Sequence, residues 1–210
     1  MRLIKYGHSC VRFEKDGAVL VIDPGELTER AALDGVDAVL ITHEHFDHLD
    51  TNALADALGK RPSVTVYAHA EVLPKLDPVS DVVTTVESGQ SFQAAGFRVR
   101  AYGGRHAVIY PGPLPVANLG FLVEGSVYHP GDSFDIPTDA QVDTLFVPIS
   151  APWLKLSESV DFVRAVKPRR AFALHDSLLN DVGLRVVDAG VARLAGCDYT
   201  RLSAGEAVDA

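Results

Sequence analysis

Short runs of apolar and β-branched residues predict strands along most of the chain. Residues 11–13 and 18–22 flank the triplet Lys15-Asp16-Gly17, whose composition is typical of a hairpin turn. Residues 36–42 (VDAVLIT) form a near-continuous apolar run, as expected of a strand that is buried on both faces. Further strands are predicted at residues 64–68, 82–86, 97–102, 119–123, 127–129, 144–149 and 171–174.

Helical spacing of the apolar positions predicts helices at residues 51–58, 70–76, 157–166 and 178–194. We expect Gly59 to end the first of these helices and Ser157 to cap the third. Residues 103–118 contain three glycines and three prolines. This composition predicts a stiffened loop without regular structure.

The order of these elements indicates the class of fold. Strands come first in hairpin-like groups and later alternate with helices, which favours an α+β arrangement of two packed mixed sheets with helices outside. One doubly wound sheet fits this order less well. No linker, low-complexity tract or charge run divides the sequence, so we expect a single domain over residues 1–210.

Composition narrows the range of partners. The formal net charge of −9 repels phosphate backbones overall, so we expect a small-molecule substrate and no nucleic acid, while a local positive pocket stays possible. Cys10 and Cys197 are too few for a disulfide framework. Residues 1–6 enter a strand without an apolar leader, and no apolar run reaches membrane-spanning length. A cytoplasmic protein is therefore expected; the oligomeric state is left open.

The chemistry concentrates in residues 42–50 (THEHFDHLD), between a buried strand and a helix. In an extended chain alternate side chains share a face, which aims His43 and His45 in one direction. Asp47 and His48 follow where the chain turns, so four potential ligands fall within six residues. Imidazole together with carboxylate suits zinc, and also manganese, iron or cobalt. We expect two adjacent metal sites to begin here.

The run HEHFDH resembles the HxHxDH signature of the metallo-β-lactamase superfamily of binuclear hydrolases. The resemblance extends from Leu3 to about Leu202 and implies a four-layer αββα sandwich. The segments that resemble the remaining motifs, in the expected order, are Ile22-Asp23-Pro24, Gly104-Arg105-His106, His129-Pro130-Gly131-Asp132-Ser133 and Leu174-His175-Asp176.

This resemblance implies a set of metal ligands. One ion is expected on His43, His45 and His106, and the other on Asp47, His48 and His175. Asp132 is expected to be shared by both ions. Asp23 is expected to orient the HEHFDH loop without binding metal, a role that fixes imidazole tautomers.

The resemblance also implies hydrolysis by a hydroxide that bridges two divalent ions, zinc in the first place. Coordination lowers the pKa of water to about 7, and two metals can stabilise the attacking and departing oxygens together. Two divalent ions bring four positive charges; Asp47, Asp132 and the hydroxide remove three, which leaves about one to meet an anionic group. The expected substrate is a lactone, a cyclic ester or a phosphoester.

The opening Tyr6-Gly7-His8-Ser9-Cys10 resembles the GHS segment of one branch, the small metal-dependent hydrolases related to ascorbate-6-phosphate lactonases. With Asp132 and Asp47, His8 is a candidate for the catalytic centre. His8 either hydrogen-bonds the substrate or closes a tight turn, and the sequence leaves both open. The segment that begins at Asn118 also fits this branch and is read as a core strand without chemistry.

Four residues are candidates for substrate contact: Trp153, Lys155, Tyr110 and Arg105. A rim aromatic and solvated charges are the alternative for each. Residues 103–118 are expected to form a wall of the substrate pocket and to set specificity. Three other functions stay open: a di-iron or other metal redox protein, a phosphodiesterase or nuclease, and a catalytically idle metal-binding protein.

Overall fold

The computed structural model describes the backbone of residues 1–210 and every side chain except that of Pro78, and these residues form two seven-stranded sheets. The strand order in the first sheet is β14-β1-β2-β3-β4-β5-β6. Its strands are β1 (Arg2–Lys5), β2 (Val11–Lys15), β3 (Ala18–Ile22), β4 (Ala38–Ile41), β5 (Thr65–Ala68), β6 (Val83–Thr85) and β14 (Ala207–Asp209).

The second sheet has the order β13-β12-β11-β10-β9-β8-β7. Its strands are β7 (Ser91–Ala94), β8 (Phe97–Arg105), β9 (Ala117–Val123), β10 (Val127–His129), β11 (Thr144–Pro148), β12 (Arg170–Leu174) and β13 (Asp198–Thr200). The helices are α1 (Thr51–Lys60), α2 (Leu156–Val166) and α3 (Asp181–Leu194), with short 3₁₀ segments at Arg30–Leu33, Ala70–Lys75 and Asp77–Val82.

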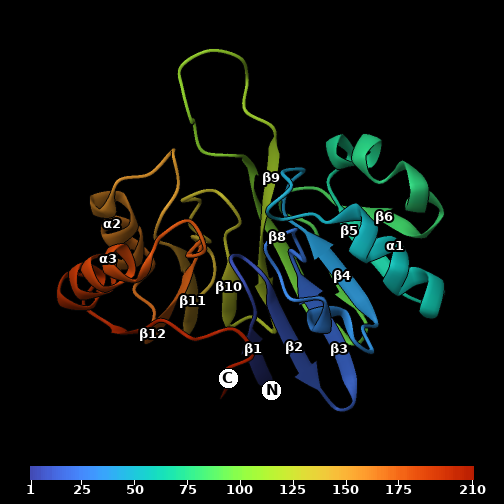
Figure 1. Cartoon of the computed structure of the whole chain (residues 1–210), viewed down its shortest axis with the longest axis horizontal. Coiled ribbons are helices and arrows are strands. Elements are labelled where there is room, and N and C mark those ends of the chain that lie inside the picture. The colour runs from blue at the N-terminus through green and yellow to red at the C-terminus, as the bar shows by residue number, and fades with distance from the viewer.

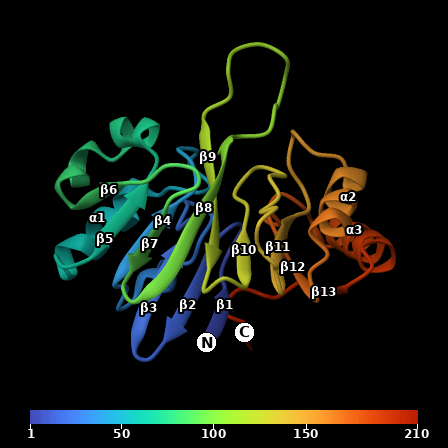
Figure 2. The same cartoon turned by 180° about the vertical axis from the view of Figure 1, so that it is seen from behind.

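The two sheets pack face to face, and the helices cover their outer faces (Figures 1 and 2). Side chains from both sheets, such as Phe13, Phe97 and Phe121, form the central core. Helix α1 packs on the outer face of the first sheet, whereas α2 and α3 pack on the second. This is the predicted α+β sandwich with helices outside, and that prediction is confirmed.

Two groups of parallel strands place the functional residues. In the first sheet β3, β4 and β5 are parallel, and in the second β10, β11 and β12 are parallel. The carboxyl ends of parallel strands meet at one edge, where ligands bind in sheets of this kind. The chain termini lie side by side at the opposite end of the molecule (Figure 1). Among the described helices, none is long and apolar enough to span a membrane.

Helix boundaries differ from those predicted at three points. Helix α1 continues through Gly59 to Lys60. Ser157 lies inside α2 rather than capping it, because the helix begins one residue earlier and the Glu158 carboxylate accepts the backbone N–H of Lys155. Helix α3 begins at residue 181 rather than 178, since the Asn180 side chain accepts the first free N–H groups.

The expectation that residues 103–118 lack regular structure is wrong at both ends. Strand β8 continues to Arg105 and pairs antiparallel with β9, which begins at Ala117. The backbone of β8 at Gly103 requires glycine: its φ is +82°, and a Cβ there would lie 2.5 Å from Oδ2 of Asp135. The irregular part is therefore residues 106–116, the β8–β9 loop, which projects beyond the rest of the molecule in Figure 1.

Candidate metal centre

The first group of converging side chains lies where β4 and β8 end. His43 and His45 follow β4, and His106 is the first residue after β8. One ring nitrogen of each lies within 4.8 Å of those of the other two. Nε2 of His43 is 3.1 Å from Nδ1 of His45. The alternating spacing in the sequence thus aims two imidazoles at a third from the other sheet.

The second group lies beside the first and joins Asp47 and His48 to His175, which follows β12. Nε2 of His175 is 3.4 Å from Oδ2 of Asp47. His8 belongs to this group as well, since its Nε2 is 3.2 Å from the same carboxylate oxygen. Three of these residues are buried histidines, and Asp47 is 9% exposed.

Asp132 joins the two groups. Its Oδ2 is 3.3 Å from Nε2 of His106, which belongs to the first group, and 3.1 Å from Nε2 of His175, which belongs to the second. Its other oxygen is 3.1 Å from Nε2 of His48. One carboxylate therefore contacts both groups, as expected of a shared ligand.

The tautomers of the histidines are set from outside the centre. Because Nδ1 of four histidines faces an oxygen acceptor, the proton resides on Nδ1 and the Nε2 lone pair faces inward. The acceptors are the carbonyl oxygen of Ala107 for His106 (2.6 Å), that of Ser150 for His175 (2.6 Å), Oδ2 of Asp23 for His48 (2.7 Å) and Oγ1 of Thr42 for His43 (3.0 Å).

These inward lone pairs are a test of whether metal fits. Among the described atoms, Nε2 of His106, Nε2 of His175 and Oδ1 of Asp132 are buried without a hydrogen-bond partner, which is costly unless a cation lies between them. Donors bound tetrahedrally at the usual zinc distances are about 3.3 Å apart. The contacts that join these donors span 3.1 to 3.4 Å. The residues fit divalent ions.

The electrostatics also favour positive charge at the centre. Burial acts to lower the pKa of His175, but the neighbouring carboxylates of Asp132 and Asp47 outweigh burial and raise the pKa to about 9. Burial likewise opposes protonation of His48, yet the carboxylates of Asp132 and Asp23 hold its pKa well above the ordinary value. Without metal, protons therefore fill the place that a cation would take, and metal binding would release them.

Asp23 contacts the backbone and the side chains that carry the HEHFDH loop. Its two oxygens accept hydrogen bonds from the backbone N–H and the hydroxyl of Thr42, and Oδ2 also accepts from Nδ1 of His48. Its φ is +53°, a left-handed conformation that is uncommon outside glycine and concentrates at functional sites. These contacts are those expected of the orienting role predicted for Asp23.

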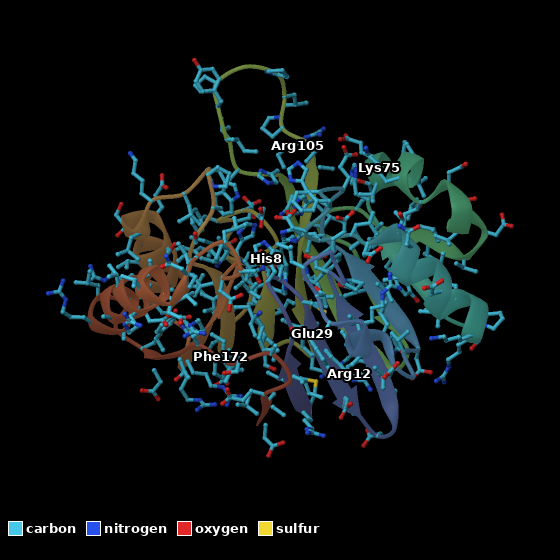
Figure 3. The ribbon with its side chains drawn as sticks, in the orientation of Figure 1. His8, Arg12, Glu29, Lys75, Arg105 and Phe172 are labelled. Atoms are coloured by element: carbon cyan, nitrogen blue, oxygen red, sulfur yellow. The ribbon has the colours of Figure 1, made fainter. Side chains whose placement is uncertain are left out.

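The structure shows one of the two roles that the sequence left open for His8, the role in a turn. It lies in a turn at φ +57°, and its Nδ1 accepts the backbone N–H of Ser177 at 3.4 Å. The proton is therefore on Nε2, which donates to Asp47. Burial lowers the pKa of His8 and so keeps the ring neutral. The ring is fully buried, and Figure 3 labels His8 near the middle of the molecule.

Of the four residues predicted to contact substrate, Trp153 reaches the metal centre. Its indole lies between His106 and Phe134. Arg105 lies at the base of the β8–β9 loop (Figure 3), where its guanidinium is bonded to the carboxylate of Glu71 at 2.7 Å. Tyr110 is 82% exposed on the loop, and Lys155 is exposed at the start of α2.

Asn118 lies in the predicted core strand, and its side chain also holds the turn that carries Asp132. Its amide donates to the carbonyl of Pro130 at 2.9 Å and accepts the backbone N–H of Asp132 at 3.0 Å. The signal was present: a fully buried asparagine within the apolar strand ANLGFLV needs partners for both ends of its amide. His129 is structural, since its Nε2 donates to the carbonyl of Ser9.

Comparison with known proteins agrees with this geometry. Residues 2–175 match a family described as the β-lactamase superfamily domain. Protein Rv0786c of Mycobacterium tuberculosis is 37% identical over 185 residues, which cover 85% of each chain.

Two solved structures have the same fold. Igni18, described as a metallo hydrolase from Ignicoccus hospitalis, superposes with a TM-score of 0.74 at 20% identity, over 99% of this chain and 97% of its own. CmlA, described as a diiron β-hydroxylase from Streptomyces venezuelae, gives a TM-score of 0.77 at 17% identity, over 100% of this chain and 54% of its own.

Proposed function

The chain belongs to the β-lactamase superfamily, and from this premise we propose that it is a metal-dependent hydrolase. It binds two divalent ions, preferably zinc, and cleaves a small ester or lactone. Relatives with lower identity carry the description metal-dependent hydrolase, among them one from Thermoplasma acidophilum at 24%. The observation that carries the proposal is the carboxylate of Asp132 between two groups of inward-facing donors.

The donor set decides what the ions could do. When bound, two such ions supply a Lewis acid for the scissile carbonyl and a nucleophile at neutral pH, since coordination lowers the pKa of water to about 7. The side chains hold their donor atoms at fixed spacing. Asp132 fixes the spacing between the two groups. Asp23 accepts hydrogen bonds from Thr42 and His48, and these bonds hold the loop that carries His43 and His48. His8 orients the Asp47 carboxylate.

Metal content and hydrolysis test the proposal together. The purified protein is expected to contain two equivalents of metal by elemental analysis, and chelation should abolish the cleavage of simple esters and lactones. Zinc should restore it. A protein that retains only one equivalent under saturating zinc, or that hydrolyses esters equally well after chelation, would contradict the proposal.

A redox function is the second candidate, since CmlA shares the fold and is described as a diiron enzyme. Imidazole and carboxylate donors suit iron as well as zinc. Reconstitution with each metal separates the two candidates: ester hydrolysis should be supported by zinc, whereas a redox protein would consume oxygen only in its iron form.

A further inference from the structure

The β8–β9 loop carries an apolar surface beside the metal centre. Val108, Ile109, Tyr110 and Leu114 are 52% to 82% exposed, and Phe46 from the HEHFDH loop is 57% exposed. Solvent-exposed apolar patches of this kind mark binding sites in soluble proteins. The loop begins at His106, directly after β8, and projects beyond the rest of the molecule (Figures 1 and 3).

A pocket of about 190 Å³ connects this surface to the metal centre. His45 and His106, two of the proposed ligands, are among the residues that line it. Among the described residues that line the pocket, none is lysine or arginine, and the remaining lining is apolar apart from the hydroxyl of Tyr110. The other lining residues are Ala107, Val108, Ile109, Tyr110, Pro113, Leu114, Pro115 and Val116.

The nearest arginine is already engaged. Nη1 of Arg105 donates to Glu71 at 2.7 Å and to the carbonyl oxygen of Pro115 at 3.2 Å. The ion pair also holds the pKa of Glu71 below its usual value. Arg105 therefore ties the loop to the body of the protein instead of offering a free cation to a phosphate group, which usually requires one.

The loop is also stiff. Three prolines between Tyr110 and Val116 limit the conformations open to the unfolded loop. The hydrogen bond from Arg105 to the carbonyl oxygen of Pro115 anchors the C-terminal end of the loop. A preformed apolar pocket binds apolar groups without the cost of ordering a mobile loop. The shape and apolar lining of this pocket therefore select the part of the substrate that lies next to the scissile bond.

We propose that the pocket binds the acyl chain of the substrate, so that the enzyme prefers esters and lactones of medium-chain carboxylic acids over phosphorylated substrates. This rests on the proposed hydrolase function. The reaction adds one water across the acyl C–O bond: the water oxygen joins the carbonyl carbon, and the departing oxygen leaves as an alcohol with a proton. The acyl chain takes no part in bond breaking and contributes only to the affinity for the substrate.

The pocket volume sets the expected chain length. A pocket of about 190 Å³ has room for several methylene groups. Each buried methylene contributes about 0.8 kcal/mol, which corresponds to about a fourfold gain in affinity. Affinity should rise with each added carbon until the pocket is filled and then level off.

Binding of n-alkanoates from acetate to decanoate to the zinc-loaded protein tests this without turnover. Calorimetry gives the dissociation constants, and the fluorescence of Trp153, the single tryptophan, gives a second readout next to His106. The kcat/KM of p-nitrophenyl esters of the same acids is measured in parallel. Leu114→Ser should flatten the dependence on chain length. Val186→Ser on α3, a similarly exposed residue outside the pocket, should leave the dependence unchanged.

The outcomes separate the two proposals. Alkanoate affinities that do not depend on chain length would overturn the acyl pocket, even if esters are hydrolysed. Alkanoate affinities that rise about fourfold per carbon in a protein that hydrolyses no ester would support the acyl pocket and contradict the proposed hydrolase function. Faster cleavage of a phosphodiester than of any ester would also overturn the acyl pocket. The same holds if Leu114→Ser changes self-association of the protein but leaves the dependence on chain length intact.

Discussion

The indole N–H of Trp153 donates a hydrogen bond to Oδ2 of Asp132 over 2.9 Å. The same oxygen contacts Nε2 of His106 and of His175, one from each donor group. The indole ring is held edge-on against Phe134, with 5.2 Å between ring centroids. Trp153 thus fixes the orientation of the carboxylate that joins the two proposed metal positions.

Replacing Trp153 with Phe should weaken metal binding. The variant keeps an aromatic ring beside His106 but loses the N–H that holds Asp132. Loss of a group that orients a ligand typically costs tenfold to a hundredfold, so we expect at least a tenfold drop in zinc affinity measured by chelator competition. Phe134→Leu is the matched control, because it disturbs the packing of the indole and keeps the hydrogen bond. Equal losses in both variants would assign Trp153 a packing role.

Asp132→Ala and Asp47→Ala should differ in the number of metals that they lose. Asp132 contacts donors of both groups, whereas Asp47 contacts His8 and His175 of the second group alone. Elemental analysis after dialysis should find both equivalents reduced in Asp132→Ala and about one equivalent retained in Asp47→Ala. Two retained equivalents of unchanged affinity in Asp132→Ala would exclude the shared ligand.

Gly25→Ala should disrupt the centre from outside it. A Cβ at this position would lie 2.0 Å from the carbonyl oxygen of Asp47 and 2.6 Å from the backbone nitrogen of His48, so the HEHFDH loop must shift. Overpacking of this kind costs about 1–3 kcal/mol or more, measured by urea unfolding, and metal content should fall with it.

Gly59→Ala in α1 is the control for that substitution, because a Cβ there meets no atom within 4 Å. Alanine favours a helix over glycine by about 0.5–1 kcal/mol, so this variant should be as stable as the parent or more stable. A Gly25→Ala protein with normal stability and full metal content would show that the loop adapts freely.

The spacing of residues 43–48 predicted a cluster of potential metal ligands, and the structure brings these side chains together. The buried strand before it and the helix after it confine this run to one loop, and the alternation of an extended chain aims His43 and His45 together. The near-continuous apolar run at β4 likewise predicted a strand buried on both faces. Features of this kind can be predicted because residues close together in the sequence determine them.

The contacts missed by the sequence join distant segments. Trp153 and Asp132 are 21 residues apart, and their hydrogen bond depends on where β11 ends relative to the turn after β10. The prediction for Gly103 failed for another reason. Glycine and proline content marked the segment as irregular, but a glycine at positive φ can lie within a strand that remains paired.

His8→Asn should separate metal positioning from substrate binding. Asparagine tolerates the left-handed conformation of His8 but is too short to reach Asp47 in the same way. Because the imidazole orients Asp47, we expect the ion on Asp47, His48 and His175 to bind at least tenfold more weakly, while the ion on His43, His45 and His106 is retained. The KM at saturating zinc should stay at the parent value, since the His8 ring is fully buried. Asp16→Asn, at φ +52° in the β2–β3 turn, controls for asparagine at such a backbone position. A raised KM with both ions bound at parent affinity would instead place His8 in contact with the substrate.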